Sequence, residues 1–181
     1  MVTICFTGHR PNKLWGYNDD RPEYDQLFKV ILKKIEEVIQ DYPMDKEFTL
    51  VTGMALGVDQ LACAASFVIR SRMEKQGKTV TIEAAIPCRG QESKWPRRSQ
   101  EKYYAMLQEV DKETYVHDGL YTFSCMNERN EYMVDKSDVV ISIWDGSNGG
   151  TGSCVHYAQS QHKRIVNFDP RDIAPTFNNK G

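Results

Sequence analysis

The sequence predicts an α/β protein, a single domain whose open parallel sheet is covered by helices on both faces. Short runs rich in β-branched and aromatic residues alternate with longer helical patterns along the whole chain, which is typical of such a sheet. At 181 residues the chain is long enough to bury one substantial core. No linker, repeat or change of composition divides it. We therefore expect one domain over residues 1–170 and a loosely ordered polar tail over 171–181.

The expected strands share a high content of valine, isoleucine, threonine and aromatic residues, which pack well on a pleated surface. In chain order they occupy 2–7, 48–52, 79–86, 114–117, 139–144 and 165–168. Each is followed by a turn, a loop or a helical segment, so parallel pairing through crossover connections is expected throughout.

Helices are expected at 21–40, 58–76, 97–109, 124–136 and 152–162. In the first of them, one set of residues keeps the three-and-four spacing that forms a stripe along a helix. This set is Leu27, Val30, Ile31, Lys34, Ile35 and Val38. Pro43 follows soon after the stripe and stops the helical run. We expect the stripe to face the core.

Composition excludes several classes of protein. The formal net charge is −2, so nucleic acid is not an expected partner, because a surface that holds it needs an excess of lysine and arginine. The five cysteines include no Cys-x-x-Cys pair, and the four histidines lack metal-ligand spacing. We expect no disulfide framework, no metal site and a cytoplasmic location. The chain shows no basic leader or membrane-length apolar run, so neither export nor membrane insertion is expected.

Three strands run into glycine turns. In the stretch 142–153, a buried strand leads through Asp145 to Gly149, Gly150 and Thr151 at the start of a helix. Glycine permits close approach of the backbone, and the free N–H groups at a helix start attract an anion. A plain tight turn would explain one such stretch, but the first and second strands also end at a Thr-Gly pair. Three turns together favour a ligand site that binds phosphate.

Residues after the first strand are candidates for this site, because open parallel sheets bind ligands beyond the carboxyl ends of their strands. Thr7, Gly8, His9 and Arg10 stand there. The Arg10 guanidinium suits a phosphate or carboxylate, with a solvated surface arginine as the alternative. Their loop, 8–21, is longer than a strand-to-helix turn needs, as functional loops often are.

The other candidates follow the second and third strands or lie on a helix. Gly53 and Gly57 permit close backbone approach, while Asp59 either caps the next helix or accepts ribose hydroxyls. Arg89 belongs to a loop with a second cation and a tryptophan, which suits stacking on a base or covering a site. Arg129 lies near an apolar helical face, where an arginine usually has an anionic partner, either a carboxylate or a ligand phosphate.

In this order the motifs resemble the SLOG superfamily, the Rossmann-like group that includes the LOG phosphoribohydrolases and the DNA-processing protein DprA, and most closely its YpsA-type branch. The resemblance reaches residue 168 or so. It is carried by 7–11, 52–59, Ile86-Pro87 with Trp95-Pro96, Arg129-Asn130 and 144–151. It implies a protein that senses or sequesters a nucleotide-derived small molecule, with ADP-ribose or an NAD-related molecule as the leading candidate, and no other cofactor.

A LOG-like hydrolase that cleaves the N-glycosidic bond of a nucleotide is the first alternative. The LOG pattern Met-His-x-Arg-Lys-x-x-Met resembles 126–133, and Gly-Gly-x-Gly-Thr-x-x-Glu resembles 149–156. Asn127 replaces the histidine, Asn130 the lysine and His156 the catalytic glutamate. Loss of that carboxylate favours binding over catalysis, although a histidine can still perform acid-base work. In such a hydrolase, His156 and Arg129 would carry the chemistry.

A DprA-like module that binds single-stranded DNA is the second alternative. The acidic balance of the chain and the lack of an appended winged-helix segment count against it. Because SLOG relatives are commonly oligomeric, the resemblance also implies a homodimer or a larger homo-oligomer.

Overall fold

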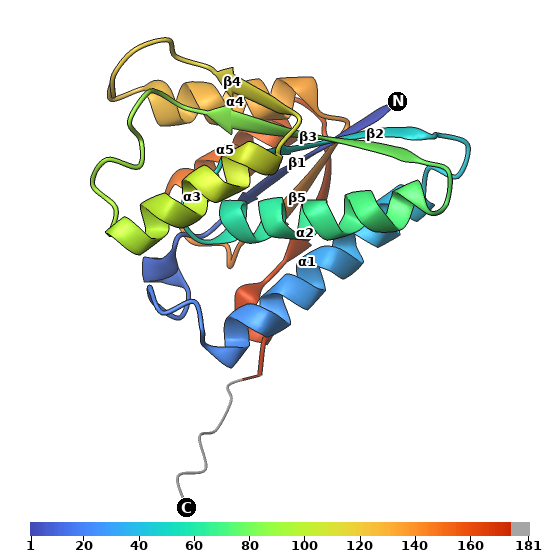
Figure 1. The fold of residues 1–181 in the computed structure, drawn as a ribbon, viewed down its shortest axis with the longest axis horizontal. Helices are drawn as coiled ribbons and strands as arrows, with labels where there is room; N and C mark the ends of the chain where they lie inside the picture. The colour runs from blue at the N-terminus through green and yellow to red at the C-terminus, as the bar shows by residue number, and fades with distance from the viewer. Residues whose placement is uncertain (175–181) are drawn as a thin grey trace, which may run out of the picture.

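A computed structural model describes residues 1–174, and its centre is one sheet of six parallel strands (Figure 1). The strands are β1 (Val2–Gly8), β2 (Glu47–Thr52), β3 (Thr79–Ile86), β4 (Lys112–Tyr115), β5 (Val139–Ile143) and β6 (Arg164–Phe168). Their order is β4-β3-β2-β1-β5-β6, with every neighbouring pair parallel. The expected fold class, a single α/β domain with an open parallel sheet, is confirmed.

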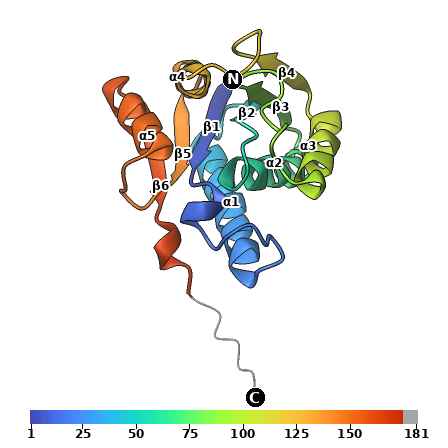
Figure 2. The ribbon, with the colours of Figure 1, turned by 90° about the vertical axis from the view of Figure 1, so that its left-hand side faces the viewer.

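Helices cover both faces of this sheet. They are α1 (Pro22–Gln40), α2 (Val58–Glu74), α3 (Arg97–Glu109), α4 (Cys125–Lys136) and α5 (Gly150–Ser160), with short 3-10 turns η1 (Pro11–Lys13) and η2 (Pro170–Asp172). Figure 2 shows α1, α2 and α3 on one side of the sheet, and α4 and α5 on the other. Right-handed crossovers produce this division, because the chain moves outward from β1 to β4 and then returns to β5 on the opposite face.

The core has two parts, one under each helical layer. Ile4 and Phe6 of β1 pack in the α1–α2 layer, whereas Cys5 between them packs with Met133 and Cys154 of α4 and α5. This alternation follows from the period of two along a strand. In α1, the expected stripe supplies the fully buried Leu27, Ile31, Ile35 and Val38. The stripe therefore faces the core, as expected.

Two elements begin two residues earlier than the sequence predicts, β4 and α5. β4 lies two residues earlier than 114–117, because its ladder with β3 begins at Lys112, a polar residue that gives little strand signal. Val116 still donates a hydrogen bond to the Ile86 carbonyl, 2.9 Å away. Helix α5 begins at Gly150 instead of 152, so the glycine turn forms its first turn.

The expected tail is ordered further than the sequence indicates. Arg171 donates to the Asp169 carboxylate and to the Asp145 carbonyl at 3.1 Å, and Ile173 is only 7 % exposed in the core beside α1. The Ile173 contact holds η2 against the core. Residues 175–181 lie outside the described residues, so the loose order expected there stays a prediction.

Candidate functional site

A cleft opens beyond the carboxyl ends of β1, β2 and β5, where the strand order reverses around β1. We call it the anion cleft. Its volume is about 240 Å³, and its place is the one expected for a ligand site in an open parallel sheet. Its lining residues are Thr7, Gly8, His9, Arg10, Asn12, Lys13, Ala55, Asp59, Met126, Asn127, Arg129, Asn130, Gly149, Gly150 and Thr151. Nine of the thirteen ligand-binding residues expected from the sequence are among them.

The start of α5 forms one wall of the anion cleft. Gly149 has φ +142°, a conformation that side-chain-bearing residues rarely adopt. This turn leads the chain into the helix at Gly150, where the space that a Cβ would occupy has no heavy atom within 4 Å. The first N–H groups of a helix have no partner inside it. They therefore offer hydrogen bonds and a partial positive charge to an anion.

Lys13 brings a cation to this wall. Its ammonium group donates to the Asn148 carbonyl at 2.6 Å and to the Ser147 hydroxyl at 3.1 Å. These contacts fix η1, which carries Lys13, against the turn before α5. The ammonium group thus lies next to the open end of the helix, where its charge adds to that of the helix dipole.

Arg10 provides a second cation, from the loop after β1. Its side chain is exposed, and its guanidinium approaches the Met126 sulfur at 3.8 Å across the cleft. A sulfur atom is a weak acceptor, so most of the hydrogen-bonding capacity of the guanidinium remains available. Arg10 therefore suits direct contact with a phosphate or carboxylate.

Arg129 is the third cation, and it is buried at the base of the cleft. Its Nη1 donates to the Gly53 carbonyl and lies 3.6 Å from the Asp59 carboxylate. Its Nε donates to the Asn130 side chain at 3.0 Å. A Cβ at Gly53 would collide with this guanidinium, so Gly53 is required for the close approach. Arg129 thereby fastens the loop after β2 to α4.

Asp59 brings the one carboxylate that lines the cleft within the described chain, and it is 6 % exposed. Burial raises its pKa, while the charge of Arg129, the Ala55 N–H and the charge of Arg10 oppose that rise. The Ala55 N–H donates to the carboxylate at 3.2 Å. Asp59 therefore holds the loop and balances Arg129, which leaves the charges of Arg10 and Lys13 for a ligand.

His9, which lines the cleft, pairs with Asp145, which does not. The His9 Nε2 lies 2.7 Å from the Asp145 carboxylate, and the Ser147 N–H donates to the same oxygen at 3.0 Å. Hydrogen bonds from Ser147 and His9 hold the pKa of Asp145 well below its usual range. The pair ties the end of β1 to the turn before α5. Asp145 itself does not line the cleft, so it acts on the turn.

Comparisons with known proteins decide the family. A family model described as the YspA SLOG family, YpsA, matches residues 4–173. The chain belongs to this SLOG family. The SPbeta prophage-derived protein YoqJ of Bacillus subtilis is 29 % identical over 152 residues, which cover 78 % of this chain and 85 % of YoqJ. The UPF0398 protein SH1465 of Staphylococcus haemolyticus is 30 % identical over 155 residues, covering 83 % and 77 %.

Two solved structures of DprA share the SLOG fold of this chain. The Streptococcus pneumoniae protein aligns with a TM-score of 0.58 at 15 % identity, covering 92 % of this chain and 50 % of that protein. This chain thus spans half the length of the pneumococcal DprA. The Helicobacter pylori protein, described by its single-stranded DNA binding mode, gives a TM-score of 0.56 at 18 % identity, with 94 % and 70 % covered.

Four of the expected ligand-binding residues lie outside the lining of the anion cleft. Gly53 and Asp145 support the cleft through the contacts above, and Gly57 lines a neighbouring cavity. Arg89 is not part of the site. Its guanidinium pairs with Asp118 at 3.0 Å and lies over the Tyr115 ring at 4.6 Å, because the loop after β3 turns toward the end of β4.

His156 also lies outside the anion cleft. It is exposed on α5, where its ring packs edge-on against Trp144 at 5.6 Å and its Nδ1 lies 3.2 Å from Gln159. Of the two residues expected to act in a SLOG hydrolase, only Arg129 therefore reaches the cleft. Arg129 is a permanent cation, so it cannot take the place of an acid or base.

Sequence reasoning did not assign six lining residues to the site: Asn12, Lys13, Ala55, Met126, Asn127 and Asn130. Lys13 is the most important of them. The unusual length of the loop 8–21 was a signal, but the loop alone does not indicate which side chain turns inward. Asn127 and Asn130 flank Arg129, so the helical spacing around that arginine was a signal for α4.

Other kinds of site find little support in residues 1–174. No group of three or more histidine, cysteine, aspartate or glutamate side chains in that range is arranged to hold a metal ion. No helix within the described part of the chain is long and apolar enough to cross a membrane.

Proposed function

We propose that the anion cleft binds a phosphate-bearing, nucleotide-derived small molecule, with ADP-ribose or an NAD-related molecule as the leading candidate. One observation carries the proposal. Arg10 and Lys13 from the loop after β1 and Arg129 from α4 converge, with the open end of α5, on one concave site. Since Asp59 balances Arg129, two further cations and a helix N-terminus remain for the ligand, an arrangement that favours phosphate.

Sensing or sequestration is favoured over turnover. His156 is exposed, packs edge-on against Trp144 and does not line the cleft, so it lies away from a ligand bound there. Cleavage of an N-glycosidic bond needs a group that handles a proton near that bond. Asp59 is the carboxylic acid among the described residues that line the cleft. It is already paired with Arg129 and accepts a hydrogen bond from the Ala55 N–H. Hydrolysis remains the second candidate, supported by the raised pKa of Asp59, which is a property of general acids.

Single-stranded DNA is the third candidate ligand. The likeness to DprA supports it at the level of the fold, and the cations of the cleft suit a backbone phosphate as well as a free nucleotide. The net charge of −2 and the concave shape of the cleft favour a small molecule. We also propose a cytoplasmic location, supported by five cysteines that are all buried free thiols.

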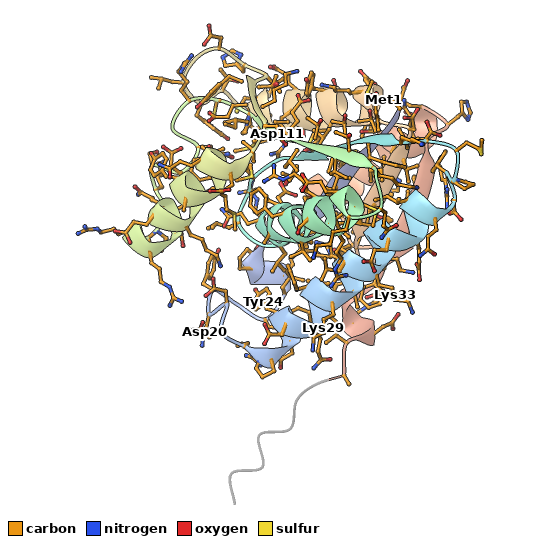
Figure 3. All side chains as sticks on the ribbon, turned by 45° about the vertical axis from the view of Figure 1, so that its right-hand side comes forward. Met1, Asp20, Tyr24, Lys29, Lys33 and Asp111 are labelled. Carbon is orange, nitrogen blue, oxygen red and sulfur yellow. The ribbon has the colours of Figure 1, made fainter. Side chains whose placement is uncertain are left out.

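Calorimetric titration tests the proposal. Wild-type protein is titrated with ADP-ribose, NAD and AMP, and with a short single-stranded oligonucleotide. Arg10→Glu and Gly150→Glu place a negative charge at the phosphate position and should abolish small-molecule binding. Lys33→Glu is the matched control, because Lys33 lies exposed on α1, away from the cleft, with its side chain 76 % accessible (Figure 3). Full affinity in both cleft variants for a ligand that the wild type binds would show that the pocket is wrong.

Preferential binding of the oligonucleotide, lost in Arg10→Glu, would assign the cleft to DNA instead. Release of free base from AMP or NAD would assign it to a hydrolase. In that case Asp59→Asn should stop the reaction, whereas His156→Ala should leave it unchanged, because His156 does not reach the cleft.

A further inference from the structure

A second cavity lies beside the anion cleft, between the loop before α1, the first half of α2 and the start of α3. Its volume is about 220 Å³, and most of its wall is carbon. We call it the apolar cavity. Figure 3 shows Tyr24, which lines this cavity, in the first turn of α1, and Asp20 in the loop before that helix. The main contributors to the wall are Tyr17, Tyr24, Leu56, Leu61, Pro96 and Met106.

A third cavity, which we call the groove, shares lining residues with both the anion cleft and the apolar cavity and also includes the exposed Lys94. Arg10 lines both the groove and the anion cleft, while Tyr17, Leu56 and Pro96 line both the groove and the apolar cavity. Trp95 is a further part of the groove wall, and its ring packs edge-on against Tyr103 at 5.4 Å. The shared lining residues place Arg10 between the anion cleft and the groove, and Tyr17, Leu56 and Pro96 between the groove and the apolar cavity.

The apolar cavity does not offer a second site for phosphate. Its rim carries Arg98 and Lys102, but Asp19 pairs with Lys102 at 2.6 Å and lies 3.6 Å from Arg98. Asp20 lies 3.5 Å from the same guanidinium. These acids balance the two cations of the rim, whereas Arg10 and Lys13 of the anion cleft have no carboxylate partner among residues 1–174. The two cavities thus suit different chemical groups.

Two polar side chains with little exposure line the apolar cavity, Tyr24 and Gln60, and the Tyr24 hydroxyl already donates to the Gly16 carbonyl. Gln60 is only 7 % exposed. Its Nε2 donates to the Met54 carbonyl at 3.3 Å, whereas its Oε1 accepts no hydrogen bond from any group among residues 1–174. A ligand that displaces water from this oxygen must replace the lost hydrogen bond, because an unsatisfied acceptor is costly. A donor group on an otherwise apolar, flat body would do so.

We propose that the apolar cavity receives the heteroaromatic ring of the ligand whose phosphate group lies in the anion cleft, an inference that rests on the proposed function. Apolar walls bury the faces of the ring, and Tyr17 and Trp95 supply rings for stacking where the groove enters. The Gln60 Oε1 accepts a hydrogen bond from a ring N–H or an exocyclic amino group. The ligand class is therefore a base joined to a phosphate, with Arg10 at the junction.

Filling the apolar cavity tests this assignment. Ala64 lines the cavity from the middle of α2 and is partly exposed, so Ala64→Phe occupies the space with little disturbance of the helix. Affinities for AMP and for ribose 5-phosphate, which lacks the base, are measured by calorimetry. We expect AMP to bind at least about tenfold more weakly to the variant, with ribose 5-phosphate binding unchanged. Thermal unfolding checks that the variant folds.

A second variant removes part of the groove wall without touching the core. Tyr17 is 68 % exposed, so Tyr17→Ala should fold normally and should weaken AMP binding alone. Met44→Ala is the control for loss of an exposed apolar side chain, because Met44 is 89 % exposed and lines neither cavity nor the groove. Wild-type affinity for AMP in both Ala64→Phe and Tyr17→Ala would overturn the assignment and leave the proposed function standing.

Equal affinity of the wild type for AMP and ribose 5-phosphate would also overturn it, since the base would then contribute nothing. Failure of the wild type to bind either compound, or ADP-ribose, would contradict the proposed function itself, and the assignment of the apolar cavity would fall with it.

Discussion

Arg129 and Asp59 form a buried ion pair between α4 and α2, and each is less than one-tenth exposed. Removing one member of such a pair leaves the other charge without compensation in a medium of low polarity. We predict that Arg129→Met lowers the free energy of unfolding by about 3 kcal/mol, measured by urea denaturation. Arg97→Met is the control, because Arg97 is exposed and pairs with Glu101 on its own helix.

This loss depends on pH. Burial already raises the pKa of Asp59, and removal of Arg129 should raise it further. When the folded-state pKa of a carboxyl group exceeds its unfolded value of about 3.9, ionisation of that group destabilises the folded protein. This destabilisation is relieved as pH falls through the folded-state pKa. The difference between wild type and Arg129→Met should therefore shrink toward acid pH. A difference that stays constant as pH falls from neutral into the acid range would contradict an ionised Asp59 in the variant.

Asp145 should show the opposite dependence. Hydrogen bonds from Ser147 and His9 lower its pKa, so its contribution to stability is fully present above the unfolded value of about 3.9 and is lost as pH falls toward the folded value. We predict that Asp145→Asn is destabilised relative to wild type at neutral pH, and that the gap narrows below about pH 4. Thermal unfolding across this range measures it. An unchanged gap would mean that the carboxylate charge has no role.

Helix α5 and the turn before it are the element on which the anion cleft depends most. Gly149→Ala places a side chain at φ +142°, with its Cβ 3.0 Å from the Lys13 ammonium. We expect a loss of about 1–3 kcal/mol in stability together with weaker ligand binding, because the turn and Lys13 both shift. Gly146→Ala is a matched control, since Gly146 also has positive φ but has open space around it and does not line the cleft. It should lose stability and keep affinity.

The elements were largely predictable, because burial in a parallel sheet leaves a clear pattern. The apolar stripe of α1 and the β-branched strands predicted the layers, and the strand-end rule placed Arg10, Asp59 and Gly150 at one cleft. What could not be predicted depended on loops. Lys13 reaches the cleft because η1 folds back onto the turn before α5, and Arg89 turns away because Asp118 and Tyr115 engage it. Such contacts join residues whose separation in sequence carries no periodic signal.

At the scale of the whole molecule, the loop between β4 and α4 exposes a group of large apolar side chains. Leu120 is 77 % exposed, Tyr121 65 % and Phe123 93 %. Exposed apolar groups of this kind often mark contact surfaces, and on this ground we propose that the homo-oligomer implied by the family resemblance forms through this loop. We predict a mass of at least twice the 20.8 kDa chain by light scattering after size exclusion. Phe123→Ser with Leu120→Ser should shift it to one chain, and a monomeric wild type would contradict the proposal.

The whole molecule unites two cavities of different chemistry at the end of one sheet. Cations and a helix N-terminus line the anion cleft, while most of the wall of the apolar cavity is carbon and its charged rim is balanced. A ligand with a phosphate and a base matches both. Added salt should weaken binding of the phosphate group strongly and binding of the base only slightly, because salt screens the charged interaction alone.

Native mass spectrometry tests the central claim most directly. Wild type and Arg10→Glu are incubated with ADP-ribose, cyclic ADP-ribose isomers, NAD and nucleoside monophosphates, and bound and released species are recorded. The account predicts one intact phosphate-bearing ligand per wild-type chain, absent from the Arg10→Glu variant. Retention of no ligand by the wild type, equal retention by both proteins, or the appearance of free base would contradict it.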